Sequence, residues 1–385
     1  MMTDAPLHTP GSFCRAMKVA FVVHDFDATF GQGRYAVELA RRLSSKCEFV
    51  VYANTFNAPG LSNVRWVKVP ALRWNVITTV FTFLPAAERL LRRDRPDVIH
   101  AQGLTGWSAD VITGHICNAA RARTLATQRN RARWFIQIVT PFERAFYRQK
   151  RATELIAISK GLSSEIQQEY GWNKGIHVLH HGTNTEQFRP PVDGWEREAL
   201  RKLFRLPDGR WHWLFMGEAV KGLRLVIEQL PQFPDAHLLV ISRSDSSSYS
   251  ALAQSLGVFD RVSFWGYEPR SELAFRAVDV FVYPSDYDPF GMVGSEAMAS
   301  GIPVILGKSI GVAELVQDGV NGLLCDPENP DTIGDRLRRL RNGPGLAARI
   351  GKAGRETVVE TSWDHNAEEV FRIYCQVATR NQGRV

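Results

Sequence analysis

The sequence predicts an α/β protein built from two doubly wound parallel sheets, one in each of two domains. Its 385 residues suit two domains at ~100–200 residues each. Short runs rich in Val and Ile, with little polar alternation, are typical of parallel strands that helices cover on both faces. This pattern stops near residue 190 and restarts at residue 211. A hydrophobic share of 44% excludes intrinsic disorder as the main state.

The first series of strands begins with the apolar residues 17–23. Six further runs are expected strands: 48–54, 63–70, 97–102, 110–116, 154–159 and 176–181. Between the first two strands, Ala36, Leu39, Ala40 and Leu43 fall at helical spacing and indicate an amphipathic helix. Alternation of strands and helices predicts a parallel sheet in this half.

The second series begins with residues 211–217. Its expected strands are 237–242, 261–266, 278–284 and 303–307, and its expected helices are 223–230, 271–277 and 293–299. Pro190, Pro191 and Gly194 mark the gap between the series. We therefore expect an N-terminal domain of residues 17–185, a C-terminal domain of residues 186–362, and a helix over 363–385 that packs back on the first domain. Residues 1–16 are expected to form a flexible extension.

The charge is divided unevenly between the halves. Residues 1–180 carry 24 Lys and Arg against 13 Asp and Glu, a balance of +11, and residues 181–385 carry 23 against 27, a balance of −4. A basic half suits a phosphate-bearing ligand, an anionic membrane surface or nucleic acid.

Cysteine usage and hydropathy indicate the compartment. The five cysteines form no Cys-x-x-Cys pair, which argues for reduced thiols and against a disulfide scaffold or a zinc site. Residues 1–16 lack the apolar core of a signal peptide. The longest apolar stretch without charge, residues 74–87, has fourteen residues, whereas a membrane-spanning helix needs ~20. We expect a cytoplasmic protein that is at most peripheral to the inner face of the membrane.

Two glycine-containing segments follow expected strands. Gly31 and Gly33, with Arg34, open the helix after the first strand, where backbone N–H groups can meet an anion. The third glycine of the dinucleotide fingerprint is absent, so NAD is not favoured, and a plain strand–turn–helix connection is an equal alternative. In the second half, Gly217 ends a strand and Lys221 stands before a helix, where a diphosphate would sit. An ordinary surface lysine is the other interpretation.

Residues 284–304 carry the most specific pattern. Asp288 follows an expected strand, Gly291 leads into a helix, and Glu296 lies on that helix. Two acids eight positions apart can meet hydroxyl groups at two places on a ligand, while the helix start between them can meet phosphate. Two helical turns span ~11 Å, a length that suits a nucleoside diphosphate joined to a sugar.

The Asp-x7-Glu pattern resembles the Glu-x7-Glu motif of retaining glycosyltransferases of the GT-B fold, family 4. Four other segments resemble motifs of that family in order and spacing: 157–159, 178–190, 260–266 and 311–322. The resemblance covers residues 17–375. It implies a nucleotide-sugar donor, most often a UDP-sugar with GDP as the other choice, transfer of a hexose-type sugar with retention, and an acceptor that is a glycan, a lipid or a small molecule.

The resemblance also implies roles for single residues. Glu296 would bind the ribose hydroxyls and Asp288 the hydroxyls of the donor sugar. Lys221 would contact the diphosphate, and His115, after the strand that ends near 114, matches the family's active-site histidine. The remaining donor-binding positions are Gly31, Gly33, Arg34, Gly217, Phe290, Gly291 and Met292.

Some positions depart from the family pattern. The Arg that usually follows the glycine is replaced by Glu218, so Arg34 or Arg243 would have to substitute for it, and His181 stands where Asn is common. The trio His24, Asp25 and Asp27 has no partner cluster, so no metal site is expected. The resemblance likewise implies an enzyme without a metal or another cofactor.

The basic stretch 117–151 holds nine Lys or Arg and one acid, with five interleaved aromatic residues. It suits an anionic membrane or a lipid-linked phosphate acceptor, and a solvated helical face is an equal alternative. Two rival functions are an epimerase acting on nucleotide sugars and a basic nucleic-acid-binding protein. The second leaves residues 288–304 unexplained, so no nucleic-acid partner is expected.

Overall fold

The computed structural model describes residues 17–29, 31–58, 60–61, 63–124 and 131–383. The strands form two parallel sheets, of seven and six strands, and a two-stranded parallel ribbon. The predicted α/β class with two parallel sheets is therefore confirmed. The expected extension 1–16 lies outside the described residues. The chain divides into one compact unit of residues 1–112 with 370–385 and a second of residues 113–369.

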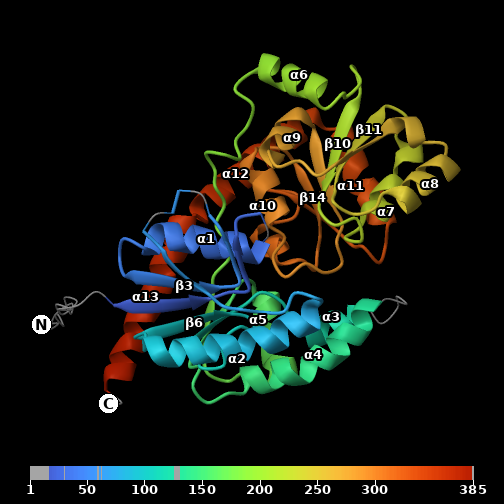
Figure 1. Cartoon of the computed structure of the whole chain (residues 1–385). Helices are drawn as coiled ribbons and strands as arrows, with labels where there is room; N and C mark the ends of the chain where they lie inside the picture. Colours follow the sequence, from blue (N-terminus) through green and yellow to red (C-terminus); the bar gives the residue numbers. More distant parts are fainter. Residues whose placement is uncertain (1–16, 30, 59, 62, 125–130, 384–385) are drawn as a thin grey trace, which may run out of the picture. The chain divides into compact units, whose positions relative to one another are not determined.

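The seven-stranded sheet has the strand order β5-β3-β1-β6-β7-β8-β9, and its first four strands belong to the first unit. Helices α1 and α2 lie on opposite faces of its strands β3 and β6 (Figure 1). The strand interiors are apolar and buried, with Phe21 and Tyr52 fully enclosed, as strands covered on both faces require. The elements are β1 Lys18–Val22, β2 Asp25–Asp27, α1 Gly31–Leu43, β3 Glu48–Ala53, β4 Thr55–Asn57, β5 Arg65–Lys68, α2 Val76–Asp94, β6 Val98–Gln102 and β7 Val111–Gly114.

The second unit contains a six-stranded sheet in the order β12-β11-β10-β13-β14-β15. The strands of this sheet are β10 Trp211–Met216, β11 Ala236–Ile241, β12 Val262–Gly266, β13 Val280–Tyr283, β14 Val304–Gly307 and β15 Leu323–Cys325. Strands β10 and β13 are neighbours near its centre, and Trp213 and Tyr283 on them are almost completely buried.

Helices and two further strands complete the second unit. The main helices are α3 Asn118–Thr124, α4 Arg131–Tyr147, α5 Lys160–Tyr170, α6 Gly194–Leu203, α7 Leu223–Ile227, α8 Ser247–Ser255, α9 Ser271–Ala277, α10 Met292–Ala299, α11 Asp331–Arg341, α12 Pro344–Glu360 and α13 Trp363–Gln382. The short 3-10 helices are η2 Leu230–Gln232, η3 Phe259–Arg261 and η4 Gly311–Leu315, and the strands are β8 Glu154–Ala157 and β9 Gly175–Val178. The end of α13 belongs to the first unit, where Tyr374 Oη lies 2.6 Å from His100 Nδ1. The domain limits at 185 and 362 stay predictions.

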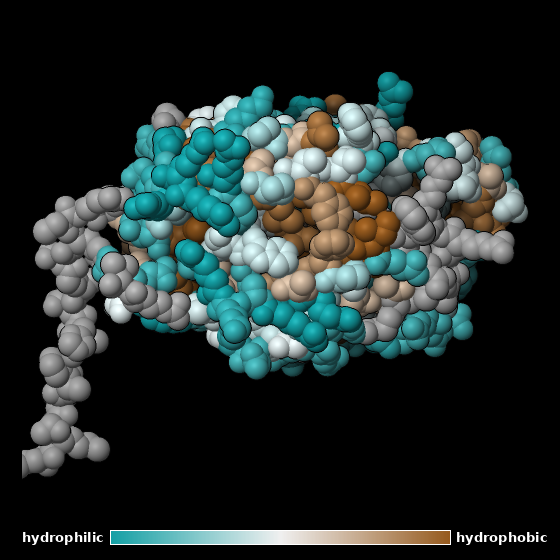
Figure 2. Space-filling model, turned by 60° about the horizontal axis from the view of Figure 1, so that its bottom comes forward, coloured by the Kyte–Doolittle hydropathy of each residue, from teal (hydrophilic) through white to brown (hydrophobic). Residues whose placement is uncertain are grey.

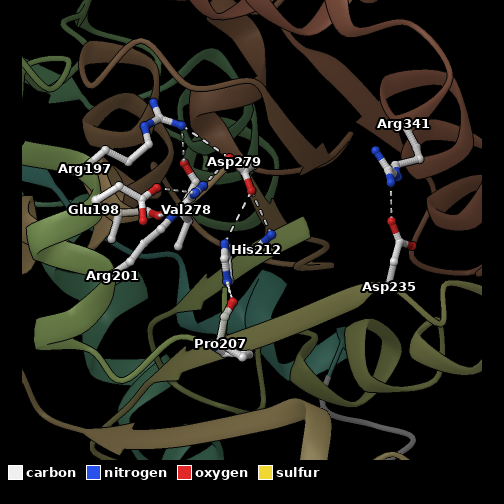
Figure 3. A network of polar contacts seen from close by, with 10 residues as sticks. Arg197, Glu198, Arg201, Pro207, His212, Asp235, Val278, Asp279 and Arg341 are labelled. Carbon is white, nitrogen blue, oxygen red and sulfur yellow. Dashed lines mark hydrogen bonds and ion pairs between the residues drawn. The ribbon is translucent and has the colours of Figure 1, made fainter. Parts of the chain in front are cut away.

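Asp279, which precedes β13, forms hydrogen bonds with β10 and α6 at the amino ends of β10 and β13 (Figure 3). Its carboxylate accepts from the His212 backbone N–H at 2.8 Å and from the Arg201 guanidinium of α6 at 2.8 Å. Although burial acts to raise it, the side chain and the backbone N–H of His212, with the charge of Arg201, hold the pKa of Asp279 below its usual range. Ligands of parallel α/β sheets bind at the carboxyl ends of strands, so this network serves the fold, and the site is expected at the opposite edge.

Candidate active site

The candidate site is built on the loops that follow β10 and β13. Because these strands are parallel neighbours, their carboxyl ends bring both loops to one edge of the sheet. Gly222, with φ of +104°, lies so close to the second loop that a Cβ there would meet the Pro284 carbonyl oxygen at 2.6 Å. Only glycine fits this close approach, which fixes Lys221 beside the loop that carries Asp288.

Lys221 and Asp288 form the centre of the site. Lys221 Nζ lies 2.8 Å from Asp288 Oδ2, and the Tyr283 hydroxyl donates to the same oxygen at 2.9 Å. Burial and the nearby Asp288 raise the pKa of Tyr283 well above its usual value, so its hydroxyl stays protonated and can donate. The ammonium group is therefore held in place at the carboxyl edge of the sheet before any ligand binds.

The start of α10 lies directly beyond Asp288. Gly291 precedes the helix with φ of +86°, a left-handed conformation that favours glycine. A Cβ at Gly291 would lie 3.5 Å from Asp288 Cγ. The first N–H groups of a helix have no acceptor within it, and with the helix dipole they favour an anion. The backbone from Phe290 to Met292 therefore brings an anion-binding helix start beside the Lys221–Asp288 pair.

Glu296 occupies the fifth position of α10 and is buried, with 5% exposure. The neighbouring Ser295 accepts a hydrogen bond from Thr183 at 2.9 Å. Gly217, which ends β10, has φ of +135°, and a Cβ there would lie 3.3 Å from the Tyr283 ring. The structure thus brings together the predicted donor-binding residues of the second half: Gly217, Lys221, Asp288, Phe290, Gly291, Met292 and Glu296.

His115 follows β7 and is linked to this loop through another ring. Its imidazole centroid lies 5.9 Å from that of His181, and His181 lies 5.0 Å from the Phe290 ring. Burial lowers the pKa of His115 to about 3. His115 is therefore neutral near pH 7, when it can orient a hydroxyl group by hydrogen bonding but supplies no positive charge.

Gly31, Gly33 and Arg34 lie in the first unit, in the opening turn of α1. A Cβ at Gly33 would lie 2.2 Å from the Asp27 carbonyl oxygen. Gly33 is therefore needed for the close approach of α1 to β2. The phosphate-binding role of these three residues stays a prediction.

Three residues of the second unit were not assigned a role from the sequence. Tyr283 reads as the end of a buried strand, Tyr287 is one residue of a longer motif, and Glu314 belongs to a distant motif. The Tyr283 side chain contacts Asp288, and the side chains of Tyr287 and Glu314 contact helix α5. The contacts of Tyr287 and Glu314 join residues more than a hundred positions apart, and the Tyr283 contact depends on how the loop after β13 turns back, so no local pattern identified them.

Two further observations bear on the predicted chemistry. The Arg243 guanidinium lies 3.7 Å from the centroid of the Tyr267 ring, a cation–π contact. Its substitution for the missing diphosphate-binding Arg stays a prediction. Within the described residues, no group of three or more His, Cys, Asp or Glu could hold a metal ion. None of the helices among these residues combines the length and the hydropathy of a membrane-spanning segment.

Comparison with known proteins identifies the family. Residues 30–187 match the model of Glycosyltransferase Family 4, and residues 196–357 match that of Glycosyl transferases group 1. A D-inositol 3-phosphate glycosyltransferase of Xylanimonas cellulosilytica is 30% identical over 312 residues, which cover 75% of this chain and 74% of the relative. The chain therefore belongs to the family of glycosyltransferases that these two models describe.

Solved structures agree on the fold. WaaG, a glycosyltransferase involved in lipopolysaccharide biosynthesis, has a TM-score of 0.79 at 18% identity and covers 92% of this chain and 99% of its own. HepE from Anabaena, solved with UDP and glucose, has a TM-score of 0.73 at 17% identity and covers 93% and 99%. The protein is a glycosyltransferase with the GT-B architecture, and it acts as a transferase.

Proposed function

We propose that the protein transfers a hexose from a nucleotide-sugar donor to an acceptor hydroxyl group, with retention at the anomeric carbon. The observation that carries this proposal is the Lys221–Asp288 pair beside the start of α10, with Glu296 further along that helix. A cation and a helix start suit the diphosphate, Asp288 suits the sugar hydroxyls, and Glu296 suits the ribose. UDP is the proposed nucleotide, in keeping with the binding of UDP and glucose by a protein of the same fold.

In the proposed reaction, the bond between the anomeric carbon and the diphosphate oxygen breaks. The acceptor oxygen forms the new bond on the same face of the sugar, and its proton passes to a phosphate oxygen of the leaving nucleotide. Negative charge grows on the diphosphate, where Lys221 and the helix start stabilise it. Neutral His115 would orient the sugar or the acceptor. We propose that these protein groups act without a metal or another cofactor.

Thermal-shift measurements against UDP- and GDP-sugars test the donor. We expect stabilisation by a UDP-sugar, followed by detection of a glycosylated product by mass spectrometry from a panel of glycan, lipid and small-molecule acceptors. Release of UDP that requires an acceptor indicates a transferase. Conversion of the donor without an acceptor would instead support the epimerase, and salt-sensitive RNA binding without nucleotide-sugar binding would refute both.

We also propose a peripheral contact with an anionic membrane at the cytoplasmic side. The first unit exposes Trp74 by 81%, Leu72 by 47% and Trp107 by 41%. Figure 2 shows an apolar area bordered by hydrophilic surface on the face to which α2 contributes. Exposed Arg73 and Arg92 lie in the same segment of the chain, and aromatic residues with nearby cations favour the lipid interface. Part of the basic stretch, residues 125–130, lies outside the described residues.

Vesicle sedimentation tests the membrane proposal. We expect binding to vesicles that contain phosphatidylglycerol and weak binding to pure phosphatidylcholine, with loss of binding in Trp74→Ser. Equal sedimentation of Trp74→Ser and the unchanged protein would contradict a contact through this segment.

A further inference from the structure

Two hydrogen bonds within the second unit fix the backbone of the loop that carries Asp288. Its backbone is held by Gly311 N–H, which donates to the Asp288 carbonyl at 2.9 Å, and by the Ser285 hydroxyl, which donates to the Tyr287 carbonyl at 3.0 Å. A Cβ at Gly311 would lie 2.2 Å from the Pro289 carbonyl oxygen, so the two backbones are in direct contact. These contacts leave the Tyr287 side chain free to reach another element.

The Tyr287 side chain contacts helix α5 and the segment that follows His115. Its hydroxyl lies 3.2 Å from Glu165 Oε2 on α5 and 3.5 Å from the Cys117 carbonyl oxygen, two residues after His115. Burial raises the pKa of Tyr287 above its usual range, so the hydroxyl keeps its single proton. It donates this proton to the nearer acceptor, Glu165 Oε2, and shares it with the Cys117 carbonyl oxygen. Both acceptors belong to the second unit, as does Asp288.

The segment after His115 is held from its other side as well. Asn118 N–H donates to Glu143 Oε2 at 3.2 Å, and Ala119 N–H donates to the Tyr170 hydroxyl at 3.1 Å. Tyr170 is the last residue of α5. The segment after His115 is therefore hydrogen-bonded to α5, the helix that Tyr287 contacts through Glu165.

Glu314 connects the Asp288 loop to α5 by a second, independent set of hydrogen bonds. Its carboxylate accepts from the N–H groups of Lys160 at 2.9 Å and Gly161 at 2.8 Å, and from His180 Nε2 at 2.8 Å. Glu314 belongs to η4, which begins at the Gly311 that anchors the Asp288 loop. Helix α5 thus supports the Asp288 loop at two places and the His115 segment at a third.

We propose that Tyr287 is a positioning residue, which sets the separation of Asp288 and His115 through the proton that its hydroxyl donates to Glu165 and shares with the more distant Cys117 carbonyl oxygen. The inference rests on the proposed transferase function and extends it. Reactants held in the wrong place by about 1 Å can lose ~10²-fold in rate, so the loss of one such tie is expected to lower turnover. Nucleotide binding depends on Glu296 and the start of α10, which Tyr287 does not contact through its hydroxyl.

The test compares Tyr287→Phe with Tyr249→Phe, which removes the same hydroxyl from a partly buried tyrosine of α8. We expect kcat for transfer to fall about tenfold in Tyr287→Phe, with an unchanged donor KM and an unchanged thermal shift with UDP. Tyr249→Phe should keep the full rate. An unchanged kcat in Tyr287→Phe, or a rise in the donor KM alone, overturns the inference.

A double-mutant cycle separates positioning from a general loss of structure. If the Tyr287 hydroxyl acts through Glu165, the variant that combines Tyr287→Phe with Glu165→Ala will lose less than the product of the two single losses. Multiplicative losses would overturn the coupling. Failure of the unchanged protein to transfer sugar would refute the proposed function itself, so the two failures are distinguishable.

Discussion

Lys221 Nζ lies 2.8 Å from Asp288 Oδ2, and the two side chains are 30% and 12% exposed, respectively. Both side chains are mostly shielded from water, so this is not an ordinary surface ion pair, which contributes only ~0–1 kcal/mol to stability. In the proposed reaction, the pair holds an ammonium group where negative charge develops on the diphosphate. The Tyr283 hydroxyl shares the same carboxylate oxygen, which fixes the direction of the pair.

Lys221→Ala is expected to lower transfer by ~10²–10³-fold, the usual cost of removing one preorganised group that stabilises charge in the transition state. The melting temperature is to be measured beside the rate, because the change leaves the part-buried Asp288 carboxylate without its cation. Lys308→Ala is the matched control, because Lys308 pairs with Asp326 on the surface of the same unit. A wild-type rate in Lys221→Ala would contradict the donor site proposed here.

Asp288→Ala and Glu296→Ala are each expected to lose most transfer activity while the protein stays folded. They should differ in nucleotide binding, because Glu296 is proposed to hold the ribose and Asp288 the sugar. Thermal shifts with UDP should therefore vanish in Glu296→Ala and persist in Asp288→Ala. Wild-type rates in both variants would refute the assignment.

His115→Ala is expected to reduce turnover more than nucleotide binding. Because burial lowers the pKa of His115 to about 3, its titration should leave no inflection in the rate profile between pH 5 and pH 8. Steady-state kinetics across this range, compared with UDP thermal shifts, check both points. A larger effect on nucleotide binding than on turnover would indicate a structural role.

Gly33→Ala should destabilise the first unit by ~1–3 kcal/mol, since a methyl group 2.2 Å from the Asp27 carbonyl forces α1 away from β2. Gly194→Ala is the control, because a Cβ there meets no atom within 4 Å, and a change within ~0.5 kcal/mol is expected. Chemical denaturation measures both. Equal stability of the two variants would contradict the contact.

Glu143→Gln tests the buried carboxyl beneath the His115 segment. Burial raises the pKa of Glu143 from 4.5 to about 7, so the folded protein binds a proton here that the unfolded chain has released. This contribution to stability is complete below pH 4.5 and is lost as the pH rises to 7. Relative to the unchanged protein, Glu143→Gln should gain up to ~3 kcal/mol between these limits. A constant difference across denaturation curves from pH 4 to pH 8 would contradict the shifted pKa.

Most strands were predicted because each carries a local apolar signal, whereas several long helices, among them α2 and α12, were not assigned from the sequence. The apolar residues 211–217 predict β10 within one residue, and the helix expected over 293–299 is α10, Met292–Ala299. Strands β2, β4 and β15 were not predicted, because each has three residues, too few for periodicity to show. The donor-side residues of the second half were predicted from the resemblance of residues 284–304 to a family motif, and their roles stay predictions.

The sequence by itself determined the two parallel sheets, the family, and the uneven charge that leaves the first 180 residues at +11. These properties depend on composition, periodicity and motifs that lie close together along the chain. Only the tertiary structure decided that Tyr283 and Lys221 share one carboxylate oxygen, and that α5 supports both Asp288 and the segment after His115. The Lys221–Asp288 and Tyr287–Glu165 contacts join residues 67 and 122 positions apart. They depend on how separate elements pack, which no local pattern records.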